Sequence, residues 1–368
     1  MDYTRRIEAV RRVMDDRGLQ VLVVGQPANR QYLSGFAHRD ETAGASAGWI
    51  VLTDREGFLI TTSLYYDEVA MTVQHLEPVR AERRILDGLI TLLSRLPGAA
   101  VGFEASWMTV DVHRQIAEAL GRAHRSLVPS DDLIGRLRAV KDAEEIDILR
   151  QAIALTDRVY SEITRWIRPG QTEREVAWQI ERTLREGGAE GMAFEPSVAA
   201  GPHAAVPHHR PSDRPIQIGE PIWIDMGARL AGYCADLTRS FCLETAPPDF
   251  LEAYDLVLRA QRVAMDGLRP GLDGRDGDAL AREVITQAGH GDEFIHSLGH
   301  GVGLDIHEAP SLGRSSEDVL EPGMVVTIEP GVYRPGWGGV RIEDVALITM
   351  QGREVLTGAL KQPVLSLT

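Results

Sequence analysis

The sequence predicts a mixed α and β fold in two parts, and two observations carry this prediction. Over residues 1–127, apolar strand-like runs alternate with amphipathic helical segments, which is the pattern of a small α/β domain. From Asp142 onward, long helical segments interrupted by Pro-Gly pairs replace that alternation. We therefore expect a linker over residues 128–136 and a second domain over residues 137–368.

The first part contains a clear order of elements. The segment RRIEAVRRVMDD predicts a helix with Ile7, Val10 and Met14 on one face, ending at Gly18. QVLVVG predicts a strand that leaves into a loop over ANRQYLSGF, and WIVLTDREGFLITT predicts a hairpin. ILDGLITLLSRL predicts an amphipathic helix and AAVGFEA a short strand, while SLVPSDDLIGRLRAV is expected to be a connector.

The second part begins with helix start signals. Two capping boxes, Asp142 with Glu145 and Thr172 with Glu175, each predict the start of a helix. The first helix is expected to run through Trp166, and the second to end at Gly187.

A similar arrangement recurs near residue 253, with a helix through Leu268 and another over about 278–289. The strings WIRPG and GLRPG mark the two breaks. This weak internal repeat favours two related halves, although chance similarity explains two such units equally well.

Composition excludes several classes of protein. The net charge of −15 argues against a nucleic-acid-binding or anionic-membrane surface. No apolar stretch is long enough to span a membrane. Cys234 and Cys242 are the only cysteines, so a disulfide framework is excluded. The first residues, MDYTRRIEAV, lack the apolar core of a signal peptide, so we expect a cytoplasmic protein.

Two aspartates stand within a predicted apolar hairpin. In PIWIDMGA, alternation places Trp223 and Asp225 on one face of a strand. The returning strand carries Asp236, and closure near Leu230 would set the two carboxylates roughly opposite each other. The alternative is a pair of exposed aspartates at a hairpin edge.

Two further strands each carry one inward glutamate. GMVVTIEPGVY places Glu329 on the face of Val325 and Thr327, and GVRIEDVALIT places Glu343 on the face of Arg341. Four converging carboxylates repel one another unless cations are present. Two divalent cations balance this charge, and carboxylates combined with imidazole suit Mn²⁺, Fe²⁺, Co²⁺ or Zn²⁺.

Histidines cluster in two segments. FIHSLGHGVGLDIHEAP contains His296, His300 and His307 among glycines that let a backbone approach a ligand closely. The proline-rich loop GPHAAVPHHRPSDRP contains three more, His203, His208 and His209. For each of them the alternative is a satisfied or solvated histidine with no role in a site.

Other catalytic motifs are absent from the sequence. His307-Glu308 is followed by Ala309-Pro310, which excludes the HExxH helix of the zincins. The run GHGVG lacks the spacing of a dinucleotide loop and the lysine of a phosphate loop, and no GxSxG elbow or CxxC pair occurs.

The strings IDMG, ADLTRSF, GHGVGLDIHEAP, TIEPGVY and GGVRIED together resemble the pita-bread metallopeptidases, the family of methionine aminopeptidase, prolidase and aminopeptidase P. The resemblance covers about residues 137–368. ANRQYLSGF further resembles the creatinase-type N-terminal domain of the Xaa-Pro peptidase branch. The resemblance implies an α+β protein, with an α/β N-terminal domain and a pita-bread domain whose pseudo-two-fold antiparallel sheet is covered by helices.

The resemblance also implies roles for individual residues. Five would bind two divalent metal ions, first expected to be Mn²⁺: Asp225, Asp236, His300, Glu329 and Glu343. His208 and His307 would contact the substrate during catalysis, and Glu329 would shuttle a proton. His296, Arg341 and Tyr333 match residues that line the substrate pocket in that branch.

The implied activity is hydrolysis of the bond between an N-terminal residue and proline by a metal-bridging hydroxide. HEAPSL has no arginine after its His-Glu pair, which slightly favours an aminopeptidase over a strict dipeptidase. The alternatives are a relative that acts on a non-peptide small molecule, as a lyase or a creatinase-like hydrolase, and a binding module without catalysis. The expected partners are proline-containing peptides and a second copy of the chain in a homodimer.

Overall fold

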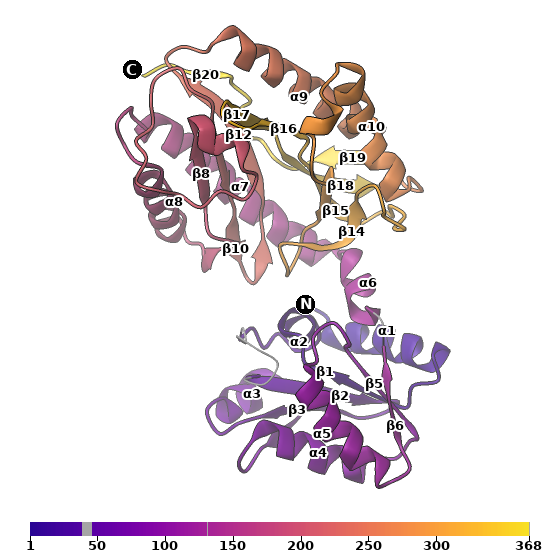
Figure 1. The fold of residues 1–368 in the computed structure, drawn as a ribbon. Coiled ribbons are helices and arrows are strands. Elements are labelled where there is room, and N and C mark those ends of the chain that lie inside the picture. Colours follow the sequence, from indigo (N-terminus) through magenta and orange to yellow (C-terminus); the bar gives the residue numbers. More distant parts are fainter. Residues whose placement is uncertain (39–45, 131, 368) are drawn as a thin grey trace. The chain divides into compact units, whose positions relative to one another are not determined.

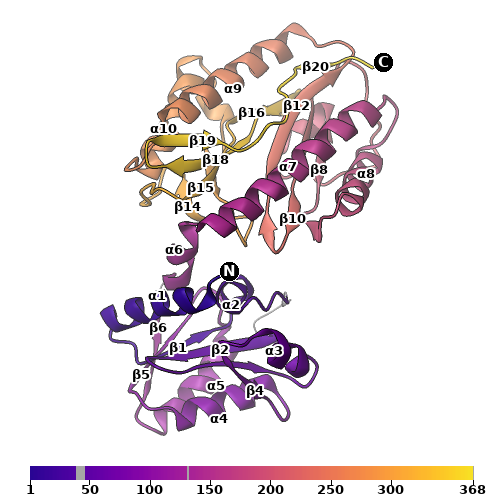
Figure 2. The same ribbon diagram turned by 180° about the vertical axis from the view of Figure 1, so that it is seen from behind.

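The computed structural model describes residues 1–368 apart from 39–45, 131 and 368. The chain divides into two compact units, Met1–Arg138 and Ala139–Thr368, which Figures 1 and 2 show from opposite sides. Within the described ranges, no helix is long and apolar enough to cross a membrane.

The first unit is built on a six-stranded mixed sheet with the strand order β4-β3-β2-β1-β5-β6. Its strands are β1 (Val21–Val24), β2 (Gly48–Thr53), β3 (Gly57–Thr61), β4 (Glu77–Arg80), β5 (Ala100–Phe103) and β6 (Ser126–Pro129). Its helices are α1 (Tyr3–Asp16), α2 (Pro27–Ser34), α3 (Tyr66–Thr72), α4 (Ile85–Arg95) and α5 (Val110–Gly121), and α6 (Leu133–Ala139) ends it. The predicted first helix, the hairpin β2–β3 and helix α4 are confirmed.

Two predictions for this unit are wrong. The loop expected after β1 is the helix α2, which Gln26 caps by accepting from Asn29 N at 2.6 Å and which Gly35 ends with φ 77°. Its length of eight residues explains why no apolar periodicity revealed it. The expected connector is also structured, because β6 pairs in parallel with β5 and α6 follows. Asp131, within the predicted linker, lies outside the described residues.

The second unit contains two sets of strands and four long helices. The helices are α7 (Ala143–Trp166), α8 (Glu173–Glu186), α9 (Pro248–Gly267) and α10 (Gly274–Gln287), with short 3₁₀ turns η2 (Gly201–Ala205) and η3 (Gly291–Glu293). The first set of strands is β7 (Gly191–Met192), β8 (Ser197–Ala200), β9 (Ile222–Met226), β10 (Ala228–Leu230), β11 (Tyr233–Cys234) and β12 (Leu237–Leu243), with β20 (Val364–Leu365) beside β12. The second set is β13 (Gly299–Gly301), β14 (Glu308–Leu312), β15 (Val325–Ile328), β16 (Gly331–Arg334), β17 (Gly338–Arg341), β18 (Asp344–Thr349) and β19 (Gly352–Val355).

The first half of this unit packs its sheet on α7 and α8. Both helices begin with the predicted capping boxes. Ile222, Ile224 and Met226 of β9 belong to one buried cluster with Ile163 of α7 and Ile180 of α8. Trp223 belongs to a separate small cluster, so the strand presents its other face away from these helices.

The second half repeats this arrangement with α9 and α10. Val326 and Ile328 of β15 belong to a buried cluster with Val257 of α9 and Ile285 of α10. Figure 1 shows the two helix pairs on their respective sheets, α7 and α8 in magenta and α9 and α10 in orange. The mixed fold with two related, helix-covered halves is therefore confirmed.

The predicted single strand GVRIEDVALIT is wrong in one respect. It is two strands, because β17 pairs with β16 while β18 pairs with β15. Glu343 lies at the break, where its amide donates to Thr238 O at 3.1 Å. The break thus brings Glu343 from the second half against β12 of the first half.

Candidate metal centre

The hairpin β9–β12 supplies both aspartates. Its turn lies at Ala231-Gly232, where φ is positive at both residues (47° and 83°). This turn lies one residue later in the chain than the closure near Leu230 expected from the sequence. As a result, Asp225 pairs with Thr238 rather than with Asp236. A shift of two pairs preserves the strand face, and the aspartates are diagonal neighbours on it.

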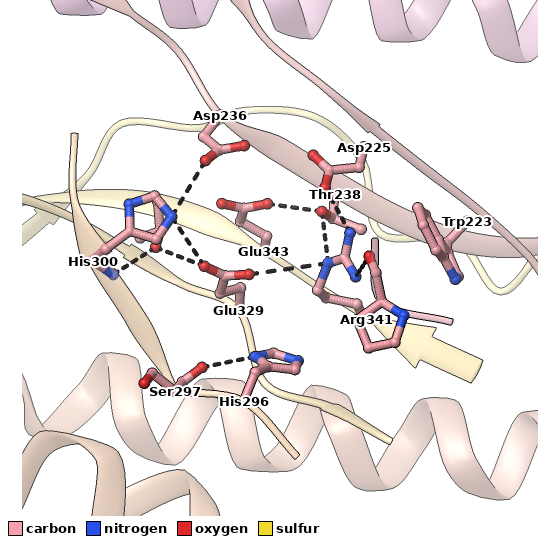
Figure 3. A network of polar contacts seen from close by, with 12 residues as sticks. Trp223, Asp225, Asp236, Thr238, His296, Ser297, His300, Glu329, Arg341 and Glu343 are labelled. Carbon is pink, nitrogen blue, oxygen red and sulfur yellow. Dashed lines mark hydrogen bonds and ion pairs between the residues drawn. The ribbon is translucent and has the colours of Figure 1, made fainter. Parts of the chain in front are cut away.

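The two halves of the unit bring the predicted acids together (Figure 3). Carboxylate oxygens of Asp225, Asp236 and Glu343 lie within 4.8 Å of one another. Glu329 joins them through His300, whose Nε2 lies 3.2 Å from Glu329 Oε1 and 3.6 Å from Asp236 Oδ2. All five residues expected to bind metal therefore surround one volume.

Electrostatics in this cluster is unfavourable without a cation. Burial, reinforced by the neighbouring carboxylates, raises the pKa of Asp236 and Glu343 well above the usual range, and burial also raises the pKa of Asp225. Burial acts in the same direction on Glu329, but the hydrogen bond and charge of His300 outweigh it and hold the pKa of Glu329 at about 2. Three carboxyl groups that resist ionisation beside one ionised carboxylate would be stabilised in their charged form by divalent cations.

The donor set fits divalent metal ions. Asp225 Oδ1 and Glu343 Oε1 are buried and accept no hydrogen bond from the described residues, although buried carboxylate oxygens are normally satisfied. His300 Nδ1 donates to Gly301 O at 3.0 Å, which leaves Nε2 as the atom directed at the carboxylates. Both features suit oxygen-rich metal ligation with one imidazole.

Two threonines support these acids, and sequence reasoning assigned them no role. Thr238 Oγ1 donates to Glu343 Oε2 at 2.8 Å, and Thr327 Oγ1 donates to Glu329 Oε1 at 3.1 Å. Each threonine lies two residues along the chain from a predicted ligand, Asp236 or Glu329, and this spacing was the available signal.

Arg341 is the buried cation of the site. Its Nη2 lies 2.6 Å from Asp225 Oδ2, and its Nη1 donates to Tyr333 OH at 3.0 Å. The guanidinium carbon lies 4.5 Å from the ring centre of Trp223. The structure thus places Arg341 and Tyr333 beside the acids, with Arg341 paired directly to one of them.

The three histidines outside the ligand set line the same cavity of about 420 Å³. His296 Nε2 contacts Tyr333 OH at 2.9 Å, and the His307 ring lies 4.2 Å from that of His300. Burial lowers the pKa of His296, and burial together with the charge of His300 lowers the pKa of His307. Neutral imidazoles are therefore favoured at both positions, and each can donate one N–H.

The histidines of the proline-rich loop separate into two groups. His208 lines the cavity together with Asp225 and Asp236. His203 and His209 instead contact the buried carboxylate of Glu173 at 3.0 and 2.9 Å. From the sequence, His203 and His209 were expected either to line a site or to be solvated, and their contact with Glu173 was not predicted.

Comparisons with known proteins place this geometry in a family. Residues 147–350 match the model of metallopeptidase family M24, and residues 6–140 match the creatinase/prolidase N-terminal domain. An Xaa-Pro dipeptidase of Pyrococcus furiosus is 35% identical over 352 residues, covering 96% of this chain and 97% of that protein.

Solved structures are similar over nearly the whole chain. An Xaa-Pro dipeptidase from Bacillus anthracis has a TM-score of 0.92 and 35% identity, covering 98% of this chain and 99% of that one. An X-Pro aminopeptidase from Thermotoga maritima has a TM-score of 0.84 and 33% identity, covering 95% and 98%. With its cluster of buried acids and its two matched domains, the chain belongs to metallopeptidase family M24 and carries a creatinase/prolidase N-terminal domain.

Proposed function

We propose that this protein is a metal-dependent exopeptidase that hydrolyses the bond between an N-terminal residue and proline. One observation carries the proposal. Two buried carboxylate oxygens, on Asp225 and Glu343, lack hydrogen-bond donors within the described ranges at the centre of a cluster of acids. The named activities of the relatives supply the substrate class, because both dipeptidases and an aminopeptidase that act at proline are similar to this chain.

The proposed ligands are the five residues around that volume, Asp225, Asp236, His300, Glu329 and Glu343. Two divalent ions would balance their carboxylate charge, with Mn²⁺ as the first expectation among the metals that such ligands suit. When bound, such ions lower the pKa of water from ~15.7 to about 7 and polarise a carbonyl.

Catalytic roles are proposed for three residues of the cavity. The Glu329 carboxylate lies 3.2 Å from His300 Nε2 among the proposed ligands, where it can accept a proton and hold it for the leaving nitrogen. His307, kept neutral by its lowered pKa, can donate its N–H to the carbonyl oxygen as negative charge develops there. His208 lies on the same cavity and is proposed to contact the substrate.

His296 and Arg341 line the cavity and are proposed to orient the substrate, whereas Tyr333, for which the sequence suggested the same role, is not among the residues that line it. His296 and Tyr333 are held together by their contact of 2.9 Å, and Arg341 fixes Tyr333 from the other side. A rigid wall of this kind suits the fixed ring of proline, because little side-chain entropy is lost when the ring binds. A homodimer in the cytoplasm stays a prediction from the sequence.

The test is metal-dependent release of the N-terminal residue from Xaa-Pro and Xaa-Pro-Yaa peptides, with and without a chelator. Chelator-sensitive cleavage of proline peptides and none of matched Xaa-Ala peptides is the expected result. The ratio of the two proline rates assigns dipeptidase or aminopeptidase behaviour. Stoichiometric metal without cleavage of either peptide would refute the proposed substrate class and favour a small-molecule substrate.

A further inference from the structure

We propose that Glu173, at the start of α8, is a positioning residue for His208, acting through the loop that joins β8 to β9. The inference deepens the proposed function and rests on it, because it takes His208 as a substrate contact. It starts from a cluster outside the metal centre, formed by Glu173, His203 and His209.

The Glu173 side chain is fully buried and accepts hydrogen bonds from the first half of the loop. Its two oxygens accept from Ala200 N at 2.9 Å, His203 Nδ1 at 3.0 Å and His209 Nε2 at 2.9 Å, and from Ser212 N at 3.0 Å and Oγ at 2.7 Å. These donors lie between the last residue of β8 and the middle of the loop, over residues 200–212. The Glu173 carboxylate therefore fixes the conformation of this part of the loop through hydrogen bonds.

Backbone contacts fix the same loop to the first turn of α8. Glu173 N donates to Arg214 O at 3.2 Å, and Arg174 N donates to Ser212 O at 3.0 Å. The free N–H groups of a helix start are used in this way to hold the returning end of the loop.

His208 depends on this support. No described residue forms a hydrogen bond with its imidazole, so its place on the cavity is set by its own backbone. That backbone is held on both sides. Pro207 O accepts from Arg341 Nη1 at 3.2 Å, while His209 is tied through its imidazole to Glu173 and through its carbonyl to Ser197 Oγ.

The same three side chains suggest a metal site as the competing interpretation. A carboxylate offers about four lone pairs, and the two backbone N–H groups and the Ser212 hydroxyl already use three of them here. Little capacity is left for an ion beside two imidazoles. The contacts favour a hydrogen-bonded anchor, and metal binding becomes an outcome of the test.

The experiment uses a double-mutant cycle in the full-length, metal-loaded enzyme with a proline peptide as substrate. His209→Phe removes the donor nearest His208 and is expected to lower kcat about 10-fold, because small misplacements of a contacting group cost this much or more. Metal content should stay that of the wild type, while the melting temperature should fall because the buried Glu173 carboxylate loses one donor. His209→Gln keeps an N–H donor and should restore most of the lost kcat. His290→Phe, which breaks another histidine–glutamate contact outside the loop, is the matched control and should change nothing.

The decisive comparison introduces His209→Phe into the His208→Ala variant. Because His209 is proposed to act only through His208, this second substitution should change kcat by less than about 2-fold. An equal loss in both backgrounds would overturn the proposal, as would an unchanged kcat in His209→Phe. The proposal would also be overturned if the wild type bound one more equivalent of Zn²⁺ than the His209→Phe variant. If His208→Ala alone keeps wild-type kcat, the role of His208 in the proposed function fails first and the positioning role with it.

Discussion

Asp236 shows why the acids of this site need a cation. It is 6% exposed and lies among carboxylates on both sides, and burial together with Glu343 and Asp225 raises its pKa well above the usual range. A group that resists ionisation in the metal-free protein becomes a good ligand only when a positive charge arrives.

We therefore expect Asp236→Ala to abolish chelator-sensitive cleavage and to lower bound metal, without destabilising the metal-free protein. Removal of one of several repelling carboxylates relieves repulsion, so the unfolding midpoint of the chelated variant should equal or exceed that of the chelated wild type. Metal analysis and denaturant unfolding measure the two effects. Asp292→Ala, at an exposed aspartate, is the control. Wild-type turnover in Asp236→Ala would refute the ligand assignment.

For Glu173 we expect the opposite effect, namely that loss of the carboxylate lowers the stability of the fold. Burial alone would raise its pKa, but the bonds from Ser212, His209 and the backbone outweigh burial and lower it. A carboxyl group with a lowered pKa stabilises the fold above its unfolded pKa, and this stabilisation is lost as the pH falls through the folded pKa. The gap in unfolding free energy between the wild type and Glu173→Gln should thus be largest at neutral pH and shrink below about pH 4.5. A gap independent of pH would show that the carboxylate charge is not what stabilises the loop.

At the scale of elements, the hairpin β9–β12 decides whether two of the proposed ligands meet. Gly227 lies between Asp225 and the turn, and a Cβ there would stand 1.9 Å from Ala235 O. The close approach of the two strands next to both aspartates requires a residue without a side chain at this position.

Gly227→Ala is expected to push the strands apart and to lower metal content and stability together. Overpacking of a tight site costs about 1–3 kcal/mol, and this clash involves backbone, which cannot move aside. Gly121→Ala is the matched control, because a Cβ there has nothing within 4 Å. Denaturant unfolding with metal analysis measures both, and a fully loaded, stable Gly227→Ala would contradict the close approach.

At the scale of the whole molecule, the proposed metal centre joins the two halves of the second unit. Asp225 and Asp236 come from the sheet on α7 and α8, whereas His300 and Glu329 come from the sheet on α9 and α10. Ions that bind both halves stabilise the folded chain over the unfolded one.

Chelation should therefore lower the melting temperature, and excess Mn²⁺ should restore it. An ion at 100 times its dissociation constant adds about 2.7 kcal/mol by mass action, which corresponds to a shift of several degrees for a domain of this size. Calorimetry with and without chelator measures the shift. An identical melting temperature under both conditions would show that no ion links the two halves.

The sequence by itself determined the local features of this protein. The capping boxes at Asp142 and Thr172 and the alternation that separates Asp225 from Ile224 depend on neighbouring residues, so they could be predicted from the chain. The family motifs brought the five proposed ligands to attention for the same reason, since each motif is a short local string. Helix α2 escaped prediction because a helix of eight residues shows too little periodicity.

The tertiary structure decided which of these groups meet. Arg341 reaches Asp225 across 116 positions, and Glu173 gathers a loop that begins 27 residues later. Such contacts arise when packed helices bring distant strands together, and no local pattern of residues encodes their distance. The break at Glu343 and the two-residue shift of the hairpin register belong to the same class, because strand pairing depends on partners far away in the chain.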